Sequence, residues 1–464
     1  MYNIIYINTH DSGRYISPYG HKVNTPVLQE LAEDATLFSK AYSCAPTCSP
    51  SRASMLTSTM PHKNGVMGLA QRGFELNNPK QHLAAHMSSV GYDTILCGIQ
   101  HEVSWYFDVD KKALNDIGYQ QILTNSAEKY AKEDYHLWDR KNADSIVDWI
   151  KNRKSEKPFM LSYGLHSTHR PYPKRIDGNI DQRYVNPAFP LDKNDLTRED
   201  HAKYLTSAQH ADASIGLVIN ALKEQGLYDN SIILFTTDHG LPLPFHKSNL
   251  RDDGIGVSMI FRHPKFGHGK VVDGLVSQID VFPTLCEILN INIPEYVEGK
   301  SFVKMFVDEK MKIRDEIFAQ MNFHTSYEPI RCVRTERYKF VKYYDYGWKK
   351  YNLSNMDDAE PKEYLIQQGV QNKQKNMEEF FDLEFDPNET NNLIGSNEYI
   401  EIIDNLRNRL NAYLIESDDP IINGDIEIKK NYKVNKQSCV KASSKNPNDY
   451  DPRGRHPSYM SIIE

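Results

Sequence analysis

The sequence Cys-Ser-Pro-Ser-Arg at positions 48–52 combines residue types that could carry covalent chemistry. Proline has a fixed φ and no amide hydrogen, so Pro50 favours the first turn of a helix. Cys48 would then lie at the N-terminus of that helix, where free amide groups and the helix dipole stabilise a thiolate or a bound anion. Arg52 lies one turn further on and could reach the same anion. The segment indicates a reactive residue in an anion-binding site, although a cysteine at a helix start is also typical of a small buried side chain.

Four apolar runs in the sequence each end in a cluster of polar residues. They cover residues 4–7, 92–99, 159–165 and 231–237. Continuous apolar runs are typical of strands that are buried on both faces, as in a parallel sheet covered by helices. Ligands bind such sheets beyond the carboxyl ends of the strands, so the residues that follow the runs are candidate site residues. These residues are His10 and Asp11, Gln100 and His101, His166, His169 and Arg170, and Asp238 and His239.

Helical patterns lie between these strands. Amphipathic spacing predicts helices over residues 25–34, 200–225 and 281–289, and a further strand is expected at 257–261. Strands that alternate with helices in this way are typical of an α/β sandwich.

The pattern changes beyond residue 310. Residues 334–343 alternate like strands of an antiparallel sheet, and residues 397–415 predict a helix that packs on it. A chain of 464 residues also exceeds the usual size of one core. We therefore expect a catalytic α/β domain at 1–310, a smaller α+β subdomain at 311–424 and an extended tail at 425–464, where core residues are few.

The order of these motifs along the chain resembles the sulfatase family of the alkaline phosphatase superfamily. The matching motifs are Cys-x-Pro-Ser-Arg at 48–52 with Ala53, Ser54, Leu56 and Thr57, His-x-x-His at 166–169 and Thr-Asp-His-Gly at 237–240. Residues 240–250 are similar to the sulfamidase branch, the N-sulfoglucosamine sulfohydrolases. The resemblance covers most of the chain. It implies an α/β alkaline-phosphatase-like sandwich, with a large mostly parallel sheet flanked by helices and a smaller C-terminal antiparallel sheet.

The resemblance implies that Cys48 is the precursor of the nucleophile. In the family this cysteine is oxidised after translation to formylglycine by a maturation enzyme. The formylglycine hydrate attacks sulfur, the alcohol or amine departs, and the remaining hydroxyl collapses to release sulfate, so catalysis passes through a covalent sulfated intermediate. The family positions that bind the sulfate or assist the nucleophile and leaving group correspond to Arg52, His101, His169 and Lys247.

One position departs from this pattern. Ile99 stands where a lysine is usual in the family, so one expected sulfate contact is missing. Arg170 or Arg251 could compensate for the lost charge, although a lone arginine at a surface is more often solvated. The resemblance therefore defines the substrate less closely than it defines the reaction.

The resemblance also implies a divalent metal ion, which polarises the sulfuryl oxygens and holds the nucleophile. Carried over by position, its ligands are His10, Asp11, the modified Cys48, Asp238 and His239. His10 and His239 stand where the commonest pattern has Asp and Asn, and their nitrogens make the site softer than an all-oxygen calcium site. Calcium is the expected ion, and manganese or another transition metal is the alternative. A second interpretation is that His10 ends its strand without touching the metal.

Composition and charge exclude several classes of protein. With 39% hydrophobic and 25% charged residues the chain is typical of a globular protein, and its formal net charge of -7 argues against a general nucleic-acid binder. No run of roughly 18 apolar residues is present, so we expect no membrane span. The N-terminus shows no basic leader and no cleavage site, so we expect a cytoplasmic protein. Six cysteines are scattered along the chain and do not form a disulfide framework.

Together these features predict a sulfatase that hydrolyses a sulfate ester or sulfamate on a small sulfated sugar, as in glycosaminoglycan degradation. Since a cytoplasmic enzyme would meet imported mono- or disaccharides, N-sulfoglucosamine is the first candidate substrate and 6-O-sulfated hexosamine the second. Two alternatives stay open. One is a phosphodiester or phosphonate monoester hydrolase of the same superfamily, whose members share the cysteine signature. The other is a non-catalytic anion-binding homologue in which Cys48 is never modified.

Overall fold

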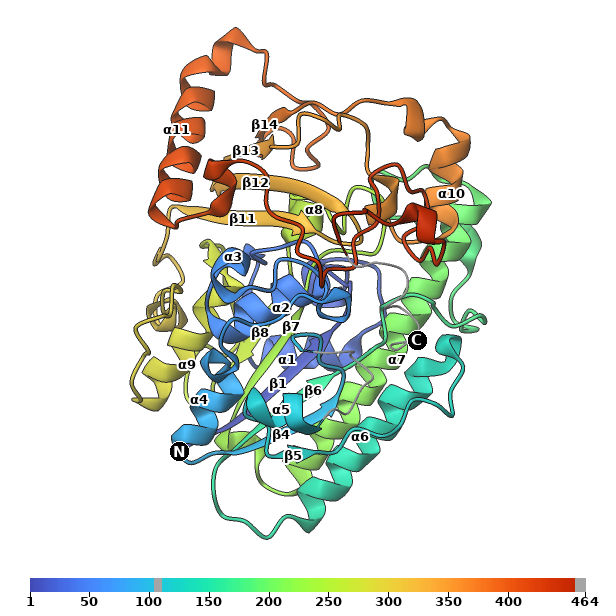
Figure 1. Cartoon of the computed structure of the whole chain (residues 1–464). Helices are drawn as coiled ribbons and strands as arrows, with labels where there is room; N and C mark the ends of the chain where they lie inside the picture. Colours follow the sequence, from blue (N-terminus) through green and yellow to red (C-terminus); the bar gives the residue numbers. More distant parts are fainter. Residues whose placement is uncertain (104–110, 455–464) are drawn as a thin grey trace.

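The structure, a computed structural model, describes residues 1–103 and 111–454 (Figure 1). Its main sheet has eight strands in the order β5-β4-β6-β1-β7-β8-β2-β9. These strands are β1 (Asn3–Thr9), β2 (Thr36–Phe38), β4 (Asp93–Gly98), β5 (Gln121–Ile122), β6 (Phe159–Gly164), β7 (Ser231–Thr237), β8 (Met259–Arg262) and β9 (Lys270–Val272). The first five in the spatial order are parallel, whereas β8 is antiparallel to both of its neighbours. The prediction of a large mostly parallel sheet is confirmed.

Helices cover both faces of this sheet because its central strands are apolar on both sides. Along β1, Ile4 and Tyr6 belong to the core on one face, whereas Ile5 and Ile7 belong to the core on the other. The first core includes residues of α2 (Cys48–Thr57), α4 (Leu83–Ser89) and α9 (Val281–Leu289), and the second includes residues of α1 (Pro26–Glu33), α6 (Tyr135–Asn152) and α7 (Asp195–Glu224). This arrangement is the α/β sandwich that the sequence predicts. No helix within residues 1–103 and 111–454 is both long and apolar enough to cross a membrane.

Two long helices differ from the expectation. α7 begins at Asp195 rather than at residue 200, because Asn194 and Thr197 cap it reciprocally, each side chain accepting a hydrogen bond from the backbone amide of the other. The sequence patterns do not predict α6. Its buried face contains Asp139 and Asn142, which are hydrogen-bonded to neighbouring loops and interrupt the apolar periodicity.

A second sheet of four antiparallel strands follows in the C-terminal part of the chain, as predicted. Its strands, in spatial order, are β11 (Glu316–Phe323), β12 (Tyr327–Thr335), β13 (Tyr338–Tyr343) and β14 (Glu378–Asp382). Residues 334–343 form the end of β12, a turn and β13. α11 (Ile400–Glu416) packs on this sheet, where Leu406 and Leu410 share a core with Phe340 and Phe380. Figure 1 shows this sheet above the main sheet, with α11 beside it.

Buried charges join the smaller sheet to the α/β part. Asp252, the first residue of α8 (Asp252–Ile255), lies 3.0 Å from Arg334 of β12 and 2.6 Å from Lys339 of β13. Burial raises the pKa of Asp252, but Arg334 and Lys339 outweigh it and hold the pKa well below the usual range. Because the loss of one partner would leave an unpaired buried charge, this network fixes the two sheets relative to each other.

The C-terminal tail packs onto the smaller sheet. Ile426, Ile428, Tyr432 and Val434 are buried in the same core as α11. The tail contains little regular structure, and residues 455–464 lie outside the described part of the chain. The described tail is therefore an extended segment that is held by its buried side chains.

Candidate active site

The carboxyl ends of the central parallel strands bring the predicted site residues together. Thr9 of β1 pairs with Thr237 of β7, so Asp11 and Asp238, which follow these strands, become neighbours. The backbone amide of Asp11 donates a hydrogen bond to Oδ1 of Asp238 at 2.8 Å. Asp11 adopts a positive φ of 45°, which turns the chain sharply after β1. Both carboxylates are buried at the edge where parallel sheets bind ligands.

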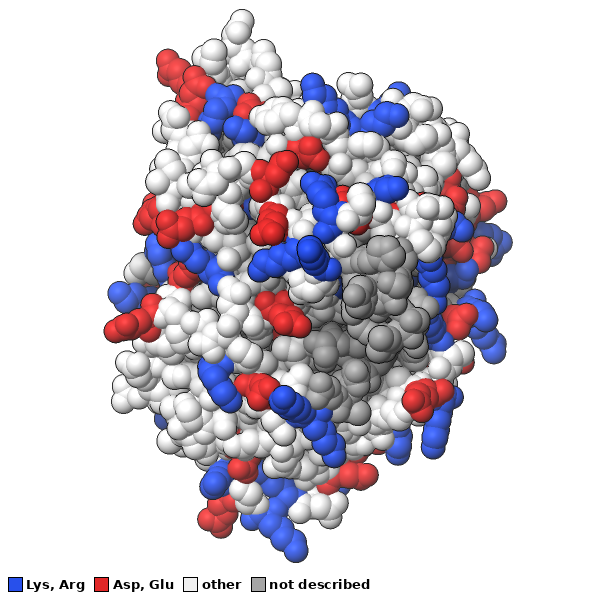
Figure 2. Space-filling view, viewed as in Figure 1, with Lys and Arg blue, Asp and Glu red and all other residues white. Residues whose placement is uncertain are grey.

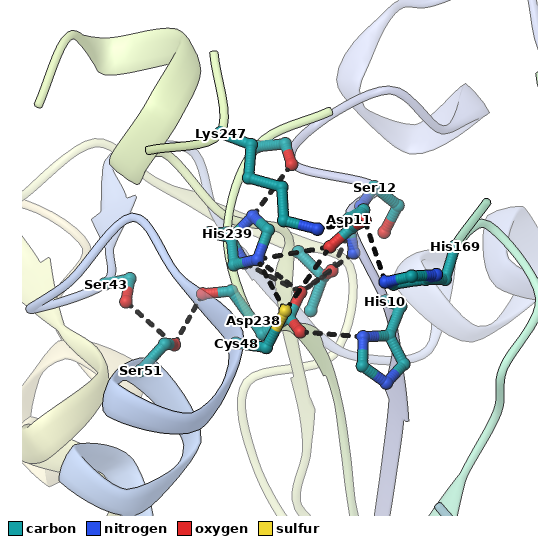
Figure 3. Close-up of polar contacts among 12 residues, drawn as sticks. His10, Asp11, Ser12, Ser43, Cys48, Ser51, His169, Asp238, His239 and Lys247 are labelled. Carbon is teal, nitrogen blue, oxygen red and sulfur yellow. Dashed lines mark hydrogen bonds and ion pairs between the residues drawn. The ribbon is translucent and has the colours of Figure 1, made fainter. Parts of the chain in front are cut away.

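Cys48 is the first residue of α2, as predicted. The hydroxyl of Ser51, in the first turn, donates a hydrogen bond to the backbone carbonyl of Asp238 at 2.5 Å and fixes the start of the helix over the end of β7. The Cys48 sulfur lies 3.4 Å from Nε2 of His239 (Figure 3). Burial raises the pKa of the Cys48 thiol well above its usual value, and Lys247 offsets this only in part. Burial therefore favours the neutral thiol, which leaves a bound anion as the group that the helix N-terminus could stabilise.

The side chains at this edge offer metal-ligating atoms in two overlapping groups. Within each group the ligating atoms lie within 4.8 Å of one another: one group is Asp11, Cys48, Asp238 and His239, and the other is His10, Asp11, Cys48 and His169. Nε2 of His239 is 3.1 Å from Oδ1 of Asp11, and Nδ1 of His10 is 3.1 Å from Oδ2 of Asp238. Buried carboxylates this close repel each other unless positive charge lies beside them. The donor set fits a divalent cation, with His169 as a ligand candidate that the sequence did not suggest.

Lys247 is a buried cation beside this cluster. Its Nζ donates hydrogen bonds to Oδ2 of Asp11 at 2.9 Å and to Oδ2 of Asp357 at 3.2 Å. Burial lowers the pKa of Lys247, but Asp11 and Asp357 outweigh it and raise the pKa well above the usual value. The amine therefore stays protonated. Figure 3 shows its nitrogen pointing toward Asp11.

Arg52 lies behind the cluster. Its Nε donates to Oδ2 of Asp238 at 3.1 Å, and its other nitrogens donate to the side chain of Asn8 and to the carbonyl of Thr9. The described pocket wall contains Lys247 but not Arg52. Arg52 is thus placed to hold Asp238 at the floor of the site, and its part in binding the sulfate or assisting the nucleophile stays a prediction.

His169 lies at the mouth of the cluster and lines the pocket. Its Nδ1 lies 2.5 Å from the carbonyl oxygen of Arg170, so Nδ1 carries a proton and donates it to that oxygen. Its Nε2 faces the cluster, 3.8 Å from Oδ2 of Asp11. This nitrogen is therefore the one that can exchange a proton with a ligand in the pocket.

His101, which follows β4, lines the same pocket. Its Nε2 lies 2.7 Å from Oε1 of Gln71. Burial lowers the pKa of His101 well below its usual value, and the charge of Arg52 adds to the effect. His101 is therefore neutral, and it can contribute hydrogen bonds but no charge.

A pocket of about 590 Å³ opens over this site, and its lining includes Cys48, His101, His169 and Lys247 together with residues from distant parts of the chain. His324 and Asp357 from the C-terminal part and Ser443 from the tail line it. Burial raises the pKa of Asp357, but Lys247 and His324 outweigh it and hold the pKa well below the usual range. Sequence reasoning missed His324 and Asp357, because both lie in loops and no motif marks them.

The arginines considered as substitutes for the missing lysine are both paired. Ile99 itself is buried in an apolar cluster. Arg170 lines the pocket, but its guanidinium contacts both carboxylate oxygens of Asp200, at 2.5 and 2.7 Å. Arg251 lies outside the described pocket wall and contacts Glu379 at 3.4 Å. Neither arginine offers an unpaired charge to the pocket.

A buried carboxylate holds the loop that carries His169. Asp139 of α6 accepts hydrogen bonds from the backbone amides of His166 at 2.8 Å and Ser167 at 2.7 Å, and from the Ser167 hydroxyl at 2.6 Å. Burial raises the pKa of Asp139 to about 7, although these hydrogen bonds act in the opposite direction. The loop is therefore anchored on a group that titrates near neutral pH.

We expect Asp139→Asn to change how stability depends on pH. A carboxyl group whose folded-state pKa is raised stabilises the fold below the unfolded-state pKa of about 4, and this contribution is lost as the pH rises through about 7. The wild-type protein should therefore lose free energy of unfolding relative to Asp139→Asn across this window. Urea unfolding at a series of pH values measures the difference, with the exposed Asp148→Asn in the same helix as control. A difference that does not vary with pH would contradict the raised pKa.

Comparisons with known families and proteins agree with this geometry. The profile described as "Sulfatase" matches residues 2–291, and the profile described as "N-sulphoglucosamine sulphohydrolase, C-terminal" matches residues 238–379. An ulvan-active sulfatase from Formosa agariphila is 26% identical over 466 residues, which cover 89% of this chain and 74% of the relative. The human N-sulphoglucosamine sulphohydrolase is 24% identical over 473 residues, which cover 90% of this chain and 91% of the relative.

A solved structure shares the fold. BT4656, in complex with its substrate D-glucosamine-2-N,6-O-disulfate, superposes with a TM-score of 0.68 at 18% identity, over 90% of this chain and 98% of that chain. The sulfatase profile covers more than half of the chain. With its motifs converging on one edge of an alkaline-phosphatase-like sheet, the chain belongs to the sulfatase family.

Proposed function

We propose that this sulfatase hydrolyses a sulfate ester or sulfamate on a small sulfated sugar, with Cys48 as the precursor of the nucleophile. The position of Cys48 carries the proposal: it starts α2 at the floor of the pocket, among the ligating atoms of Asp11, Asp238 and His239. A buried neutral thiol is a poor nucleophile, because the thiolate is the reactive form. Conversion to formylglycine by a maturation enzyme, which family membership implies, would place an oxygen nucleophile at the same point.

For the metal ion we propose calcium first and manganese second. Asp11 and Asp238 would supply oxygens and His239 a nitrogen, with His10 beside Asp238. Carboxylate oxygens suit calcium and manganese, whereas imidazole shifts the preference toward transition metals. When bound, the ion would polarise the sulfuryl oxygens of the substrate.

Lys247 and His169 would contribute charge and a proton to the reaction. The protonated amine of Lys247 lines the pocket and can neutralise negative charge on the sulfate. Nε2 of His169 faces the same space and, once protonated, can donate to the departing oxygen or nitrogen. The neutral His101 donates its one N–H to Oε1 of Gln71, so its other nitrogen can accept a proton or a hydrogen bond from the substrate. The chain thus supplies a cation for the negative charge of the sulfate and a separate histidine for the proton of the leaving group.

The size and charge of the pocket support a mono- or disaccharide. Its volume of about 590 Å³ lies within the range of roughly 300–1,000 Å³ that small-molecule sites occupy. Relatives named for ulvan and for N-sulphoglucosamine, and BT4656 with its glucosamine disulfate, support a sulfated sugar. On the part of the surface that Figure 2 shows in colour, charges of both signs are interspersed, unlike the continuous basic surface that attracts a long polyanion.

A panel of substrates tests the proposal. We expect the highest kcat/KM for N-sulfoglucosamine or, second, 6-O-sulfated hexosamine, and values at least about tenfold lower for intact heparan sulfate and for a phosphodiester. Product release is measured with metal-loaded protein in which mass spectrometry has established the state of Cys48. A preference for the phosphodiester would move the protein to the phosphodiester and phosphonate hydrolases, and a preference for the polymer would overturn the size argument. Binding without turnover would favour the anion-binding alternative.

A further inference from the structure

Arg72 is a buried arginine in the wall of the same pocket. It ends the short turn η2 (Ala70–Arg72), which is tied to the candidate catalytic residues on both sides. The amide of Ala70 donates to the hydroxyl of Ser49 in α2 at 3.0 Å, and the side chain of Gln71 contacts His101 at 2.7 Å. Arg72 therefore shares one pocket with the groups that would act on the sulfate, and its turn is hydrogen-bonded to His101 and to the residue after Cys48.

The hydrogen bonds of Arg72 all go to uncharged oxygens within residues 1–103 and 111–454. Nη1 donates to the carbonyls of Thr325 at 3.4 Å and Lys433 at 3.2 Å and to Oδ1 of Asn435 at 3.1 Å. Nη2 donates to the carbonyl of Ala442 at 3.1 Å. Burial lowers the pKa of Arg72 to about 10, so the guanidinium is still charged at neutral pH.

The other lysines and arginines of the described pocket wall each have a carboxylate partner. The pairs are Arg170 with Asp200 at 2.5 Å, Lys174 with Glu133 at 3.1 Å, Lys203 with Glu199 at 2.7 Å and Lys247 with Asp11 at 2.9 Å. Arg72 lies in the same wall, but no carboxylate of the described residues forms an ion pair with it. A negatively charged group on a bound substrate would supply the balance.

The need to hold the C-terminal tail in place does not explain why the residue at position 72 is charged. Arg72 does hold the tail, through Lys433, Asn435 and Ala442. However, the neutral side chain of Asn435 also donates to the carbonyl of Ala442, at 3.2 Å. Burying a charge without a counter-charge is much more costly than burying a neutral amide that makes the same hydrogen bonds. A glutamine could hold the tail at lower cost, so the charge itself points to a ligand.

We propose that Arg72 is a specificity-determining residue that binds a second anionic group of the substrate, either a second sulfate on the same sugar or a carboxylate on the neighbouring sugar. The inference rests on the proposed sulfatase activity and narrows its substrate class to sugars with two negative groups. Lys247 would face the sulfate that is cleaved, and Arg72 the group that is kept. The planar guanidinium suits this task, because it binds sulfate-like and carboxylate groups through parallel hydrogen bonds.

Arg72→Gln removes the charge but keeps an amide that can donate to the tail. We expect it to lower kcat/KM for D-glucosamine-2-N,6-O-disulfate by about 10- to 100-fold, and kcat/KM for the monosulfate that the wild type cleaves by less than about threefold. The loss should lie in KM, because the retained group is bound equally in the ground state and the transition state. N-sulfoglucosamine linked to a uronic acid, compared with the same sugar linked to glucose, distinguishes a carboxylate from a second sulfate.

Two control variants separate the charge from the structure. Arg183→Gln makes the same substitution at an exposed arginine that pairs with Asp181. Asn435→Ala removes contacts to the same tail segment but leaves the charge of Arg72 in place. Both variants should keep the wild-type ratio of disulfate to monosulfate kcat/KM. Arg72→Lys, which retains a positive charge, should restore part of that ratio.

Equal losses on the monosulfate and the disulfate, or the same change of ratio in Asn435→Ala, would overturn the inference and leave Arg72 with a structural role. Calorimetric binding of the two sugars to Cys48→Ala protein, with and without Arg72→Gln, tests the contact without turnover. Equal affinities in that comparison would also overturn it. A loss of disulfate affinity in Arg72→Gln, seen while the wild type releases no sulfate, would support the contact and contradict the proposed function alone.

Discussion

Cys48→Ala protein is expected to release no measurable sulfate, with kcat at least about 10⁴-fold below that of the wild type, as for the loss of a covalent nucleophile in other hydrolases. The other hydroxyls of the described pocket wall are those of Tyr172, Thr325 and Ser443. Burial raises the pKa of the Tyr172 hydroxyl well above its usual value, so this hydroxyl stays protonated and is a poor nucleophile. Those of Thr325 and Ser443 belong to the C-terminal part, and they donate to the carbonyl of Ser354 and the carboxylate of Asp358. The position at the start of α2, beside Asp11, is therefore not replaceable by a neighbour.

The fold should survive this change, because alanine at the start of α2 removes one buried sulfur and no backbone hydrogen bond. Cys286→Ala is the matched control: Cys286 is equally buried, in α9, and belongs to the apolar core. It should keep the wild-type kcat while showing a similar small decrease in Tm. Measurements of kcat and Tm on both variants test whether Cys48 is needed for turnover but not for folding. Near-normal turnover by Cys48→Ala would end the assignment of Cys48 as nucleophile precursor.

The main sheet could be predicted because its central strands are apolar on both faces. Residues 4–7, 159–165 and 231–237 are mostly apolar and form β1, β6 and β7. The strand expected at 257–261 is β8, but its antiparallel direction depends on the connection that precedes it and not on its own side chains. β2 and β9 have three residues each, which is too short for any periodicity to emerge.

The site residues that directly follow a predicted strand could be predicted from the sequence. The site residues that reach the pocket only through tertiary packing could not. Asp11 and Asp238 follow adjacent parallel strands, so the order of the strands in the sheet is enough to place these two residues side by side. Asp357 and Arg72 reach the pocket from a loop and a short turn, and the spacing of residues in the sequence does not show how these segments pack. The protonation state of Cys48 could not be predicted for the same reason, because the local argument from the helix N-terminus does not include the burial that raises the pKa.

Two overlapping clusters could hold the metal ion, because Asp11 and Cys48 belong to both of them. The geometry favours the cluster that His239 completes. Nε2 of His239 lies 3.1 Å from Oδ1 of Asp11, whereas Nε2 of His169 lies 3.8 Å from Oδ2 of the same residue. The side chain of His169 is also 22% exposed, while that of His239 is fully buried. A buried ligand is held in place by its surroundings, and a partly exposed histidine is better suited to moving a proton.

We therefore expect His239→Ala to weaken metal binding by more than the roughly 10- to 100-fold that the loss of a supporting contact costs, and to lose turnover with it. His169→Ala should change metal affinity by less than that, yet lower kcat by about 10²- to 10⁴-fold, because it loses a proton donor. His268→Ala, at an exposed histidine paired with Asp34, should leave both quantities unchanged. Metal content after dialysis against a chelator, and titration with calcium and then manganese, measure the affinities. Retention of the ion by His239→Ala together with its loss from His169→Ala would place the metal in the other cluster, since His10 and His169 would then complete its ligand set.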